Sequence, residues 1–98
     1  MKSKPSPFIN RKKKTIVFHM VNPCATHITV AGSFNQWARN QIEMKPDSEG
    51  EWIAEIPLLP HGKYLYKFFI DDRMATEDIE NPYREPDGVN GWNSLLMV

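Results

Sequence analysis

The run Tyr64–Ile70 most constrains the fold, because nearly all its residues are aromatic or aliphatic and favour an extended strand. Successive side chains of a strand point to opposite faces, so the face richer in aromatic residues is expected in the core. Lys67 would then point outward from the middle of a sheet. The Asp71-Asp72 pair that follows predicts a hairpin turn, since aspartate tolerates the left-handed conformation. The expected core face carries Tyr64, Tyr66, Phe68 and Ile70, and the other face carries Leu65, Lys67 and Phe69.

Shorter runs of strand-forming residues recur along the chain, separated by turn residues such as glycine, proline and asparagine. No helical period of useful length interrupts them. This pattern predicts an all-β fold, namely an immunoglobulin-like antiparallel β-sandwich of about seven to eight strands. Residues 77–93 are expected to form a long polar connection that is functional or held across a surface. The further expected strands are Thr15–Val21, His27–Ala31, Ile42–Lys45, Glu51–Ile56, Arg73–Thr76 and Ser94–Val98.

The N-terminal residues differ in composition from the rest of the chain. Residues 1–14 contain Pro5, Pro7 and the basic run Arg11–Lys14, with few apolar side chains to bury. We expect these residues to form a flexible basic arm, and residues 15–98 to form the sandwich domain. A basic run can contact an acidic partner or nucleic acid, but a solvated tail is its commoner role.

Charge and composition argue against several classes of protein. The 98 residues suffice for one small domain, and their formal net charge of zero argues against a nucleic-acid binder. No apolar run approaches the roughly 18 residues of a membrane span, and the N-terminal lysines do not lead into the apolar stretch of a signal peptide. The single cysteine, Cys24, excludes an intrachain disulfide and is compatible with a reducing compartment. We therefore expect a cytoplasmic protein that binds neither nucleic acid nor membranes.

The sequence offers no catalytic or metal-binding motif. His19 and His27 lack acidic or cysteine ligands at a suitable spacing and are expected to be surface strand histidines. Cys24 has no neighbouring base that would make it a nucleophile. Carboxylates that could form a glycosidase-like pair fall mostly in expected turns, where acidic residues serve the backbone. The expectation is a protein without catalytic activity, metal or cofactor.

The stretch Val30–Trp37 is the best candidate for a binding site. Its apolar strand stops at Gly32, Phe34 is expected to anchor in the core, and Asn35 suits a tight turn. Trp37 would then lie outside on a constrained loop, beside amide side chains, as a sugar-binding surface requires. The alternative is that Trp37 only closes the end of the sandwich. Trp52, by contrast, alternates with a core face and is expected to be buried.

Several of these segments, in this order and spacing, resemble the family-48 carbohydrate-binding modules. That family includes the glycogen-binding domain of the AMP-activated protein kinase beta subunit and the N-terminal domains of branching and debranching enzymes. The resemblance covers about residues 15–98 and implies an early-set immunoglobulin-like sandwich that binds α-1,4-linked glucans such as glycogen or starch. The segments that carry it are Val30–Trp37, Gly50-Glu51-Trp52, Gly62–Asp71, Asn81-Pro82 and Asn93-Ser94.

The resemblance also implies which residues hold the sugar. Trp37, Lys67 and Asn93 match three of the principal binding positions of the kinase-type members, while a second tryptophan of that type is replaced here by Met74. The loss removes a flat, rigid surface and leaves a flexible thioether. Trp92, beside Asn93 in a glycine-containing loop, is a candidate to compensate, or it plugs the end of the sandwich.

Two functions from different classes remain open on the sequence. The first is a non-catalytic module that binds glycogen, starch or maltooligosaccharides, either free-standing or paired with a glycogen-metabolising enzyme or kinase. The second is an interaction module of the same fold that has lost sugar binding. It would dock on a kinase or an amylase-type enzyme through Met74, Leu65, Phe69 and the long connection.

Overall fold

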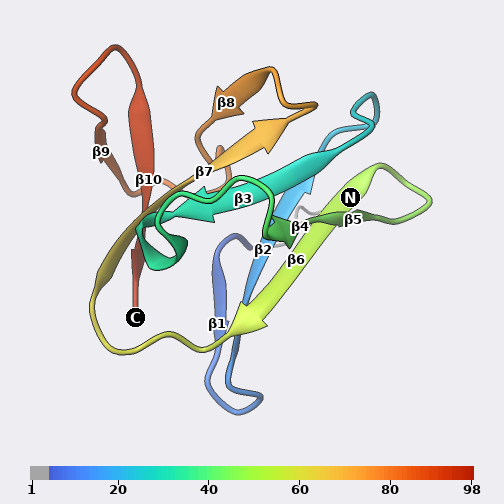
Figure 1. Cartoon of the computed structure of the whole chain (residues 1–98). Helices are drawn as coiled ribbons and strands as arrows, with labels where there is room; N and C mark the ends of the chain where they lie inside the picture. The colour runs from blue at the N-terminus through green and yellow to red at the C-terminus, as the bar shows by residue number, and fades with distance from the viewer. Residues whose placement is uncertain (1–4) are drawn as a thin grey trace.

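The computed structural model describes residues 5–98, which form two antiparallel β-sheets packed face to face (Figure 1). The first sheet has the strand order β1–β2–β6–β5, with bounds β1 Phe8–Asn10, β2 Thr15–Val21, β6 Glu51–Pro57 and β5 Lys45–Pro46. In the second sheet the order is β4–β3–β7–β10–β9, and β8 also pairs with β7. Its bounds are β4 Ile42–Glu43, β3 Ile28–Gly32, β7 Lys63–Ile70, β10 Trp92–Met97, β9 Arg84–Pro86 and β8 Met74–Thr76. The predicted fold class, an all-β immunoglobulin-like sandwich, is confirmed.

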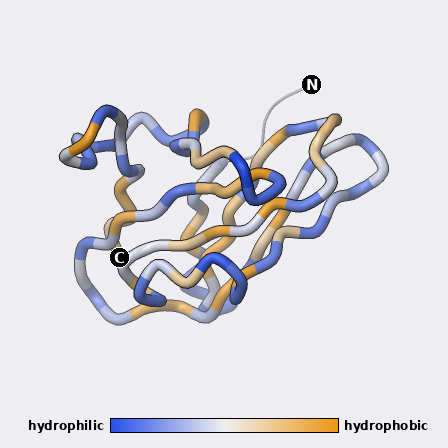
Figure 2. The backbone as a smooth tube through the Cα atoms, turned by 45° about the horizontal axis from the view of Figure 1, so that its top comes forward, coloured by the Kyte–Doolittle hydropathy of each residue, from blue (hydrophilic) through white to orange (hydrophobic). Residues whose placement is uncertain are grey.

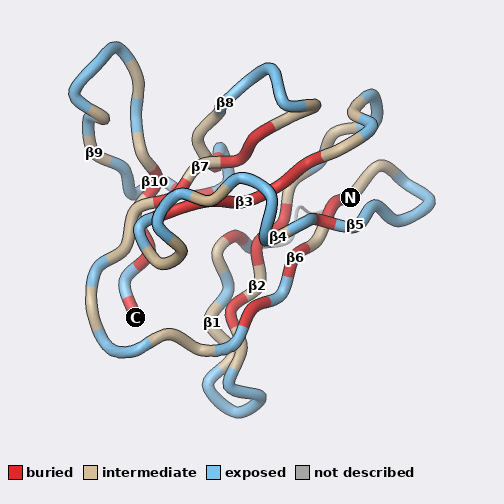
Figure 3. The backbone as a smooth tube through the Cα atoms, in the orientation of Figure 1, coloured by how far each residue is buried: buried red, intermediate tan, exposed pale blue. Residues whose placement is uncertain are grey.

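The core lies between the facing surfaces of the two sheets, as the buried segments of β2, β3, β6 and β7 show (Figure 3). Figure 2 shows hydrophobic stretches of the backbone in the interior of the fold, while many of the connecting loops are hydrophilic. Phe18 lies at its centre, with its ring centroid 4.9 Å from that of Tyr66 and 6.4 Å from that of Phe68. Trp52 is 4% exposed, so its prediction as a core tryptophan is confirmed.

His19 differs from its prediction, whereas the Asp71-Asp72 turn agrees with it. His19 is 1% exposed and its Nε2 lies 2.9 Å from Glu51 Oε1, so the prediction of a surface histidine is wrong. The backbone amide of His19 also donates to Ser6 Oγ in the segment before β1. Asp71 and Asp72 both have positive φ and form the predicted hairpin turn between β7 and β8.

Part of residues 1–14, which were expected to form a flexible arm, belongs to the sandwich in the structure. Residues 8–10 form strand β1, which pairs antiparallel with β2 in the register Ile9↔Ile16, and Ser6 is buried. The folded domain therefore includes residues well before Thr15. Residues 1–4 of the expected arm lie outside the described residues.

The connection expected to be irregular, residues 77–93, contains the short strand β9, which pairs with the start of β10. Its first part is held by buried polar residues rather than by apolar packing: Asp78 and Asn81 are 1% and 5% exposed. The strands of residues 5–98 number ten rather than seven or eight, because β1 and β9 were not expected and residues 42–46 form two strands. Within the described residues, no helix is long and apolar enough to cross a membrane.

Candidate functional site

A tight loop after β3 holds Trp37 in place. One turn of 3-10 helix, Ser33–Asn35, follows Gly32, and then Gln36 and Trp37 both adopt positive φ, 55° and 58°. Backbone and amide bonds close the loop: the Trp37 N–H donates to the Gly32 carbonyl at 2.9 Å, and the Gly32 N–H donates to Asn35 Oδ1 at 3.0 Å. The Asn35 amide also donates to the Ala38 carbonyl at 3.1 Å. Asn35 thus serves the turn that its sequence position predicted.

Close packing beneath this loop explains its glycine and its phenylalanine. A Cβ on Gly32 would collide with the Leu65 carbonyl oxygen and come within 2.7 Å of the Phe34 ring. Phe34 packs against the core, with its ring centroid 6.0 Å from that of Phe18 and 6.3 Å from that of Tyr64. Trp37 stays 37% exposed, so the prediction of an indole outside the core on a constrained loop is confirmed.

Trp37 borders an open groove of about 550 Å³ on the outward face of the second sheet. The groove brings Trp37 together with Lys67 of β7 and Asn93 of β10, which are 30 and 26 positions apart in sequence. Lys67 points outward from β7 as expected, since its neighbours Tyr66 and Phe68 are fully buried on the core side. The full lining is Trp37, Arg39, Leu65, Lys67, Phe69, Ala75, Asp87, Val89 and Asn93.

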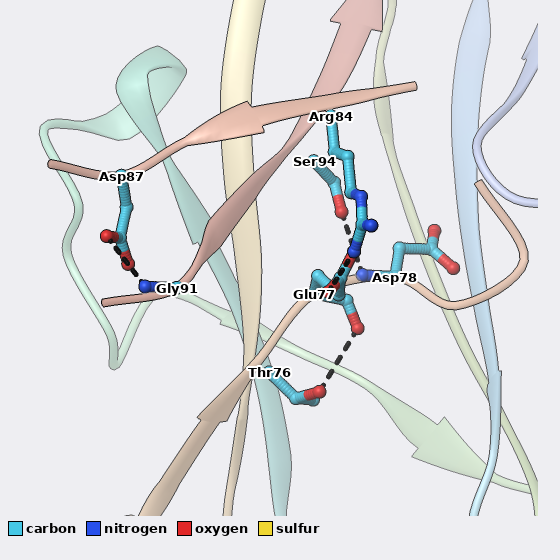
Figure 4. A network of polar contacts seen from close by, with 7 residues as sticks. All are labelled: Thr76, Glu77, Asp78, Arg84, Asp87, Gly91 and Ser94. Atoms are coloured by element: carbon cyan, nitrogen blue, oxygen red, sulfur yellow. Dashed lines mark hydrogen bonds and ion pairs between the residues drawn. The ribbon is translucent and has the colours of Figure 1, made fainter. Parts of the chain in front are cut away.

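An ion pair at the groove fixes its polar centre. Lys67 Nζ lies 2.7 Å from Asp87 Oδ2, and both side chains are largely buried, at 19% and 12% exposed. The other oxygen of Asp87 accepts the amides of Val89 and Gly91, at 2.8 and 3.1 Å. Asp87 and Gly91 face each other across the loop between β9 and β10 (Figure 4). One carboxylate therefore both orients Lys67 and shapes the loop that precedes Asn93.

These contacts determine the charge of Asp87. The hydrogen bond from Lys67 lowers the pKa of the carboxyl most, followed by the amides of Val89 and Gly91, and holds it well below its usual range. Asp87 therefore remains a carboxylate at neutral and mildly acidic pH, and its charge offsets that of Lys67. The centre of the groove is a neutral ion pair rather than a free cation.

A second contact lies on the same loop as Trp37. Arg39 places its Cζ 4.4 Å from the centroid of the Phe69 ring. Phe69 faces outward from β7, between Thr29 of β3 and Ala75 of β8, yet is only 6% exposed. The guanidinium of Arg39 is among the groups that cover this ring.

Two residues predicted at the site lie outside this groove. Met74 is 60% exposed and pairs with Ile70 in the β7–β8 hairpin, while its neighbour Ala75 lines the groove instead. Trp92 is 40% exposed and lies on the face of β10 opposite to Asn93. Its ring is 4.2 Å from Arg84 Cζ, and Arg84 forms an ion pair with Glu77 (Figure 4).

Sequence reasoning missed four residues of the groove, namely Arg39, Ala75, Asp87 and Val89. Arg39 belongs to no recognisable sequence motif, and its position over Phe69 follows only from the folded loop. Asp87 and Val89 lie in the turn-rich segment Pro86–Asn90, where turn residues predict a loop but not its contacts. Val89 is an apolar side chain that is 85% exposed at the groove, and this exposure is set by the folded path of the loop.

The groove carries several groups that can contact a ligand. It offers an exposed indole, an exposed aliphatic side chain, ammonium and guanidinium donors, and the amide of Asn93. Asp87 is the only carboxylate among the described residues that line it, whereas glycoside hydrolysis uses a pair. Within residues 5–98 no group of histidine, cysteine or acidic side chains is arranged to hold a metal ion.

Comparison with known proteins gives a family for this arrangement. A search of curated proteins finds no match to the chain. The model of one protein family matches residues 5–84, which include β1, the Trp37 loop, Lys67 and the β7–β8 hairpin. That family is carbohydrate-binding module 48, the isoamylase N-terminal domain, and the chain belongs to it.

Proposed function

We propose that the protein binds α-1,4-linked glucans, such as glycogen, starch or maltooligosaccharides, in the groove beside Trp37, without a catalytic step. The observation that carries this proposal is the convergence of Trp37, Lys67 and Asn93 on one open groove. An open groove suits a chain polymer, because sugar units can continue past either end of it. Membership of a family of carbohydrate-binding modules supports the same ligand class.

Trp37 would supply most of the binding free energy. The C–H face of a pyranose ring lies flat on an indole, and covering about 100 Å² of apolar surface contributes roughly 2–3 kcal/mol before the costs of association. The closed loop holds the ring ready for this contact, since its backbone bonds and the Asn35 amide already restrict it. Little further ordering entropy is then lost on binding.

Lys67 and Asn93 would hold the sugar hydroxyl groups. Lys67 uses one ammonium donor on Asp87 and retains two for a ligand, while Asn93 supplies both a donor and an acceptor. Because Asp87 offsets the charge of Lys67, this ammonium can donate to neutral hydroxyl groups without adding net charge to the groove. Val89, exposed at the rim, can pack against a further pyranose face.

We expect weak binding to a single oligosaccharide. Met74, which stands where the kinase-type members have a second tryptophan, lies outside the groove. Trp37 is the only tryptophan among the described residues that line it. One such stacking surface supports a dissociation constant of about 1 mM, near −4 kcal/mol.

The decisive experiment is a titration of the protein with maltoheptaose, and with β-cyclodextrin in parallel, followed by tryptophan fluorescence. The comparison uses the variants Trp37→Ala and Trp92→Ala, because the two indoles are exposed to nearly the same extent, 37% and 40%, and only Trp37 lines the groove. We expect a saturable change that Trp37→Ala abolishes and that Trp92→Ala retains with an unchanged dissociation constant.

Other outcomes are equally informative. Loss of binding in Trp92→Ala alone would move the site to the opposite face of β10. Absence of any change in the parent protein up to tens of millimolar sugar, far above the roughly millimolar value expected, would contradict the proposal. The groove would then be investigated as a docking surface for a kinase or an amylase-type enzyme.

A further inference from the structure

Arg39 and Phe69 form a stacked pair in the groove, and this pair has no part in the glucan contacts described above. The Arg39 guanidinium carbon is 4.4 Å from the centroid of the Phe69 ring, the distance of a cation–π contact. Phe69 is anchored in β7 and held between β3 and β8, so the ring beneath the guanidinium cannot easily move. A flexible exposed side chain is thereby given a fixed plane.

The donors of Arg39 are available to a ligand. Within residues 5–98, no hydrogen bond or ion pair engages its five N–H groups, although the residue lines the groove. Lys67 differs, since Asp87 holds it at 2.7 Å and offsets its charge. Arg84, the other arginine stacked on an aromatic ring, is paired with Glu77. Arg39 thus combines a fixed orientation with unused donors.

The position of Arg39 relative to Trp37 matters for a polymer ligand. Two residues of chain span at most about 7 Å, so the start of the Arg39 side chain lies within that distance of the Trp37 backbone. Both side chains line one groove. A glucan chain that stacks on Trp37 and follows the groove therefore also passes Arg39.

We propose that Arg39, held flat on Phe69, is a second recognition element that donates its forked N–H groups to two adjacent hydroxyl oxygens of a glucose unit. This inference rests on the proposed glucan binding and names the residue that replaces a second stacking surface. A planar fork suits a pair of neighbouring oxygens, whereas a lysine ammonium at the same place is a point donor. The stack also lowers the ordering cost of the long side chain.

The test is a set of titrations of isotopically labelled protein with maltoheptaose, followed by two-dimensional amide NMR. We expect Arg39→Ala to raise the dissociation constant roughly five- to tenfold, the effect of losing about two hydrogen bonds. Arg39→Lys is expected to lose nearly as much, because it keeps the charge without the planar fork. Arg73→Ala, at an exposed arginine of the β7–β8 turn outside the groove, is the matched control and is expected to bind like the parent.

A modified ligand tests the hydroxyl contact directly. Methylation of the 2- and 3-hydroxyl groups of β-cyclodextrin places a methyl group where the fork would approach each oxygen. It is therefore expected to weaken binding to the parent more than to Arg39→Ala. Equal effects of methylation on the two proteins would overturn the assignment of those hydroxyl groups to Arg39. Thermal unfolding of each variant shows whether the fold is intact.

Three outcomes overturn the inference while leaving the proposed function standing. They are unchanged affinity in Arg39→Ala, tighter binding in that variant, and full affinity in Arg39→Lys. Tighter binding would mean that Arg39 covers the Phe69 ring and competes with the sugar. Failure of the parent protein itself to bind glucan would overturn the proposed function, and this inference with it.

Discussion

Single residues decide whether the Trp37 loop can form. Gly32 lies where β3 approaches β7 so closely that no side chain fits. The side-chain amide of Asn35 accepts the Gly32 N–H and donates to the Ala38 carbonyl. The positive φ angles of Gln36 and Trp37 are tolerated because these bonds close the turn around them. These constraints on the loop, rather than packing of the ring itself, hold the Trp37 indole at the surface.

Replacing Gly32 with alanine is therefore expected to destabilise the protein by about 1–3 kcal/mol, the usual cost of forcing extra volume into a packed site. The added Cβ would meet the Leu65 carbonyl, which belongs to the β7 backbone and cannot rotate away, and would lie 2.9 Å from Tyr66 Cβ. Urea denaturation measures the change. Gly88→Ala is the comparison, because no atom lies within 4 Å of its added Cβ and only its positive φ adds a cost. An equal or larger loss in Gly88→Ala would contradict the steric explanation.

The elements that sequence patterns described best are the long central strands. Alternation along residues 64–70 placed Tyr66 and Phe68 in the core and Lys67 outside, and the structure agrees. The short edge strands β1 and β9 escaped prediction, since each has only three residues and pairs through its backbone. A strand of that length carries too few side chains to show a period.

Removal of strand β1 is expected to destabilise the protein. A chain that begins at Thr15 lacks β1 and Ser6, which accepts the His19 amide and donates to Asp78. Because these buried groups would lose their partners, we expect a loss of at least about 2 kcal/mol, or roughly 8 °C or more in the unfolding temperature. Calorimetry of the shortened chain measures it, with Ser6→Ala in the full chain as a milder comparison. An unfolding temperature equal to that of the parent would show that residues before Thr15 are dispensable.

At the scale of the whole molecule, one buried polar network joins the two sheets. Asp78 accepts hydrogen bonds from the Ser6 hydroxyl and from Tyr66 Oη, the latter at 2.8 Å, and its own amide donates to Ser94 Oγ at 2.8 Å. Asn81 donates to both Tyr66 Oη and the Leu95 carbonyl. The segment before β1, the strands β7 and β10 and the connection after β8 are thus held at one buried point.

The same network predicts a pH dependence. Burial raises the pKa of Asp78, with the hydroxyl groups of Ser6 and Tyr66 acting in the opposite direction. A carboxyl whose pKa is higher in the folded state contributes stability that is fully present below its unfolded pKa and is lost as the pH rises through the folded pKa. Asp78→Asn removes this charge, so the variant should lose less stability than the parent between about pH 4 and about pH 7.

Urea denaturation across that range checks the prediction. The other titratable groups near Asp78 are Tyr66, Glu80 and His19, and all of them are kept in the variant. Parallel stability curves for parent and variant would show that Asp78 does not titrate in this window. A steeper fall in the variant would reverse the sign of the argument.

The sequence by itself determined the class of fold, the main strands, the exposed Trp37 and the outward position of Lys67. These follow from local rules: side-chain alternation, turn residues and the space that a glycine leaves. The tertiary structure alone decided the groove. It paired Lys67 with Asp87, laid Arg39 on Phe69, and put Trp92 and Met74 outside the groove that Asn93 lines. These contacts join residues remote in sequence or depend on the folded path of a loop, and no local pattern encodes the distance between such residues.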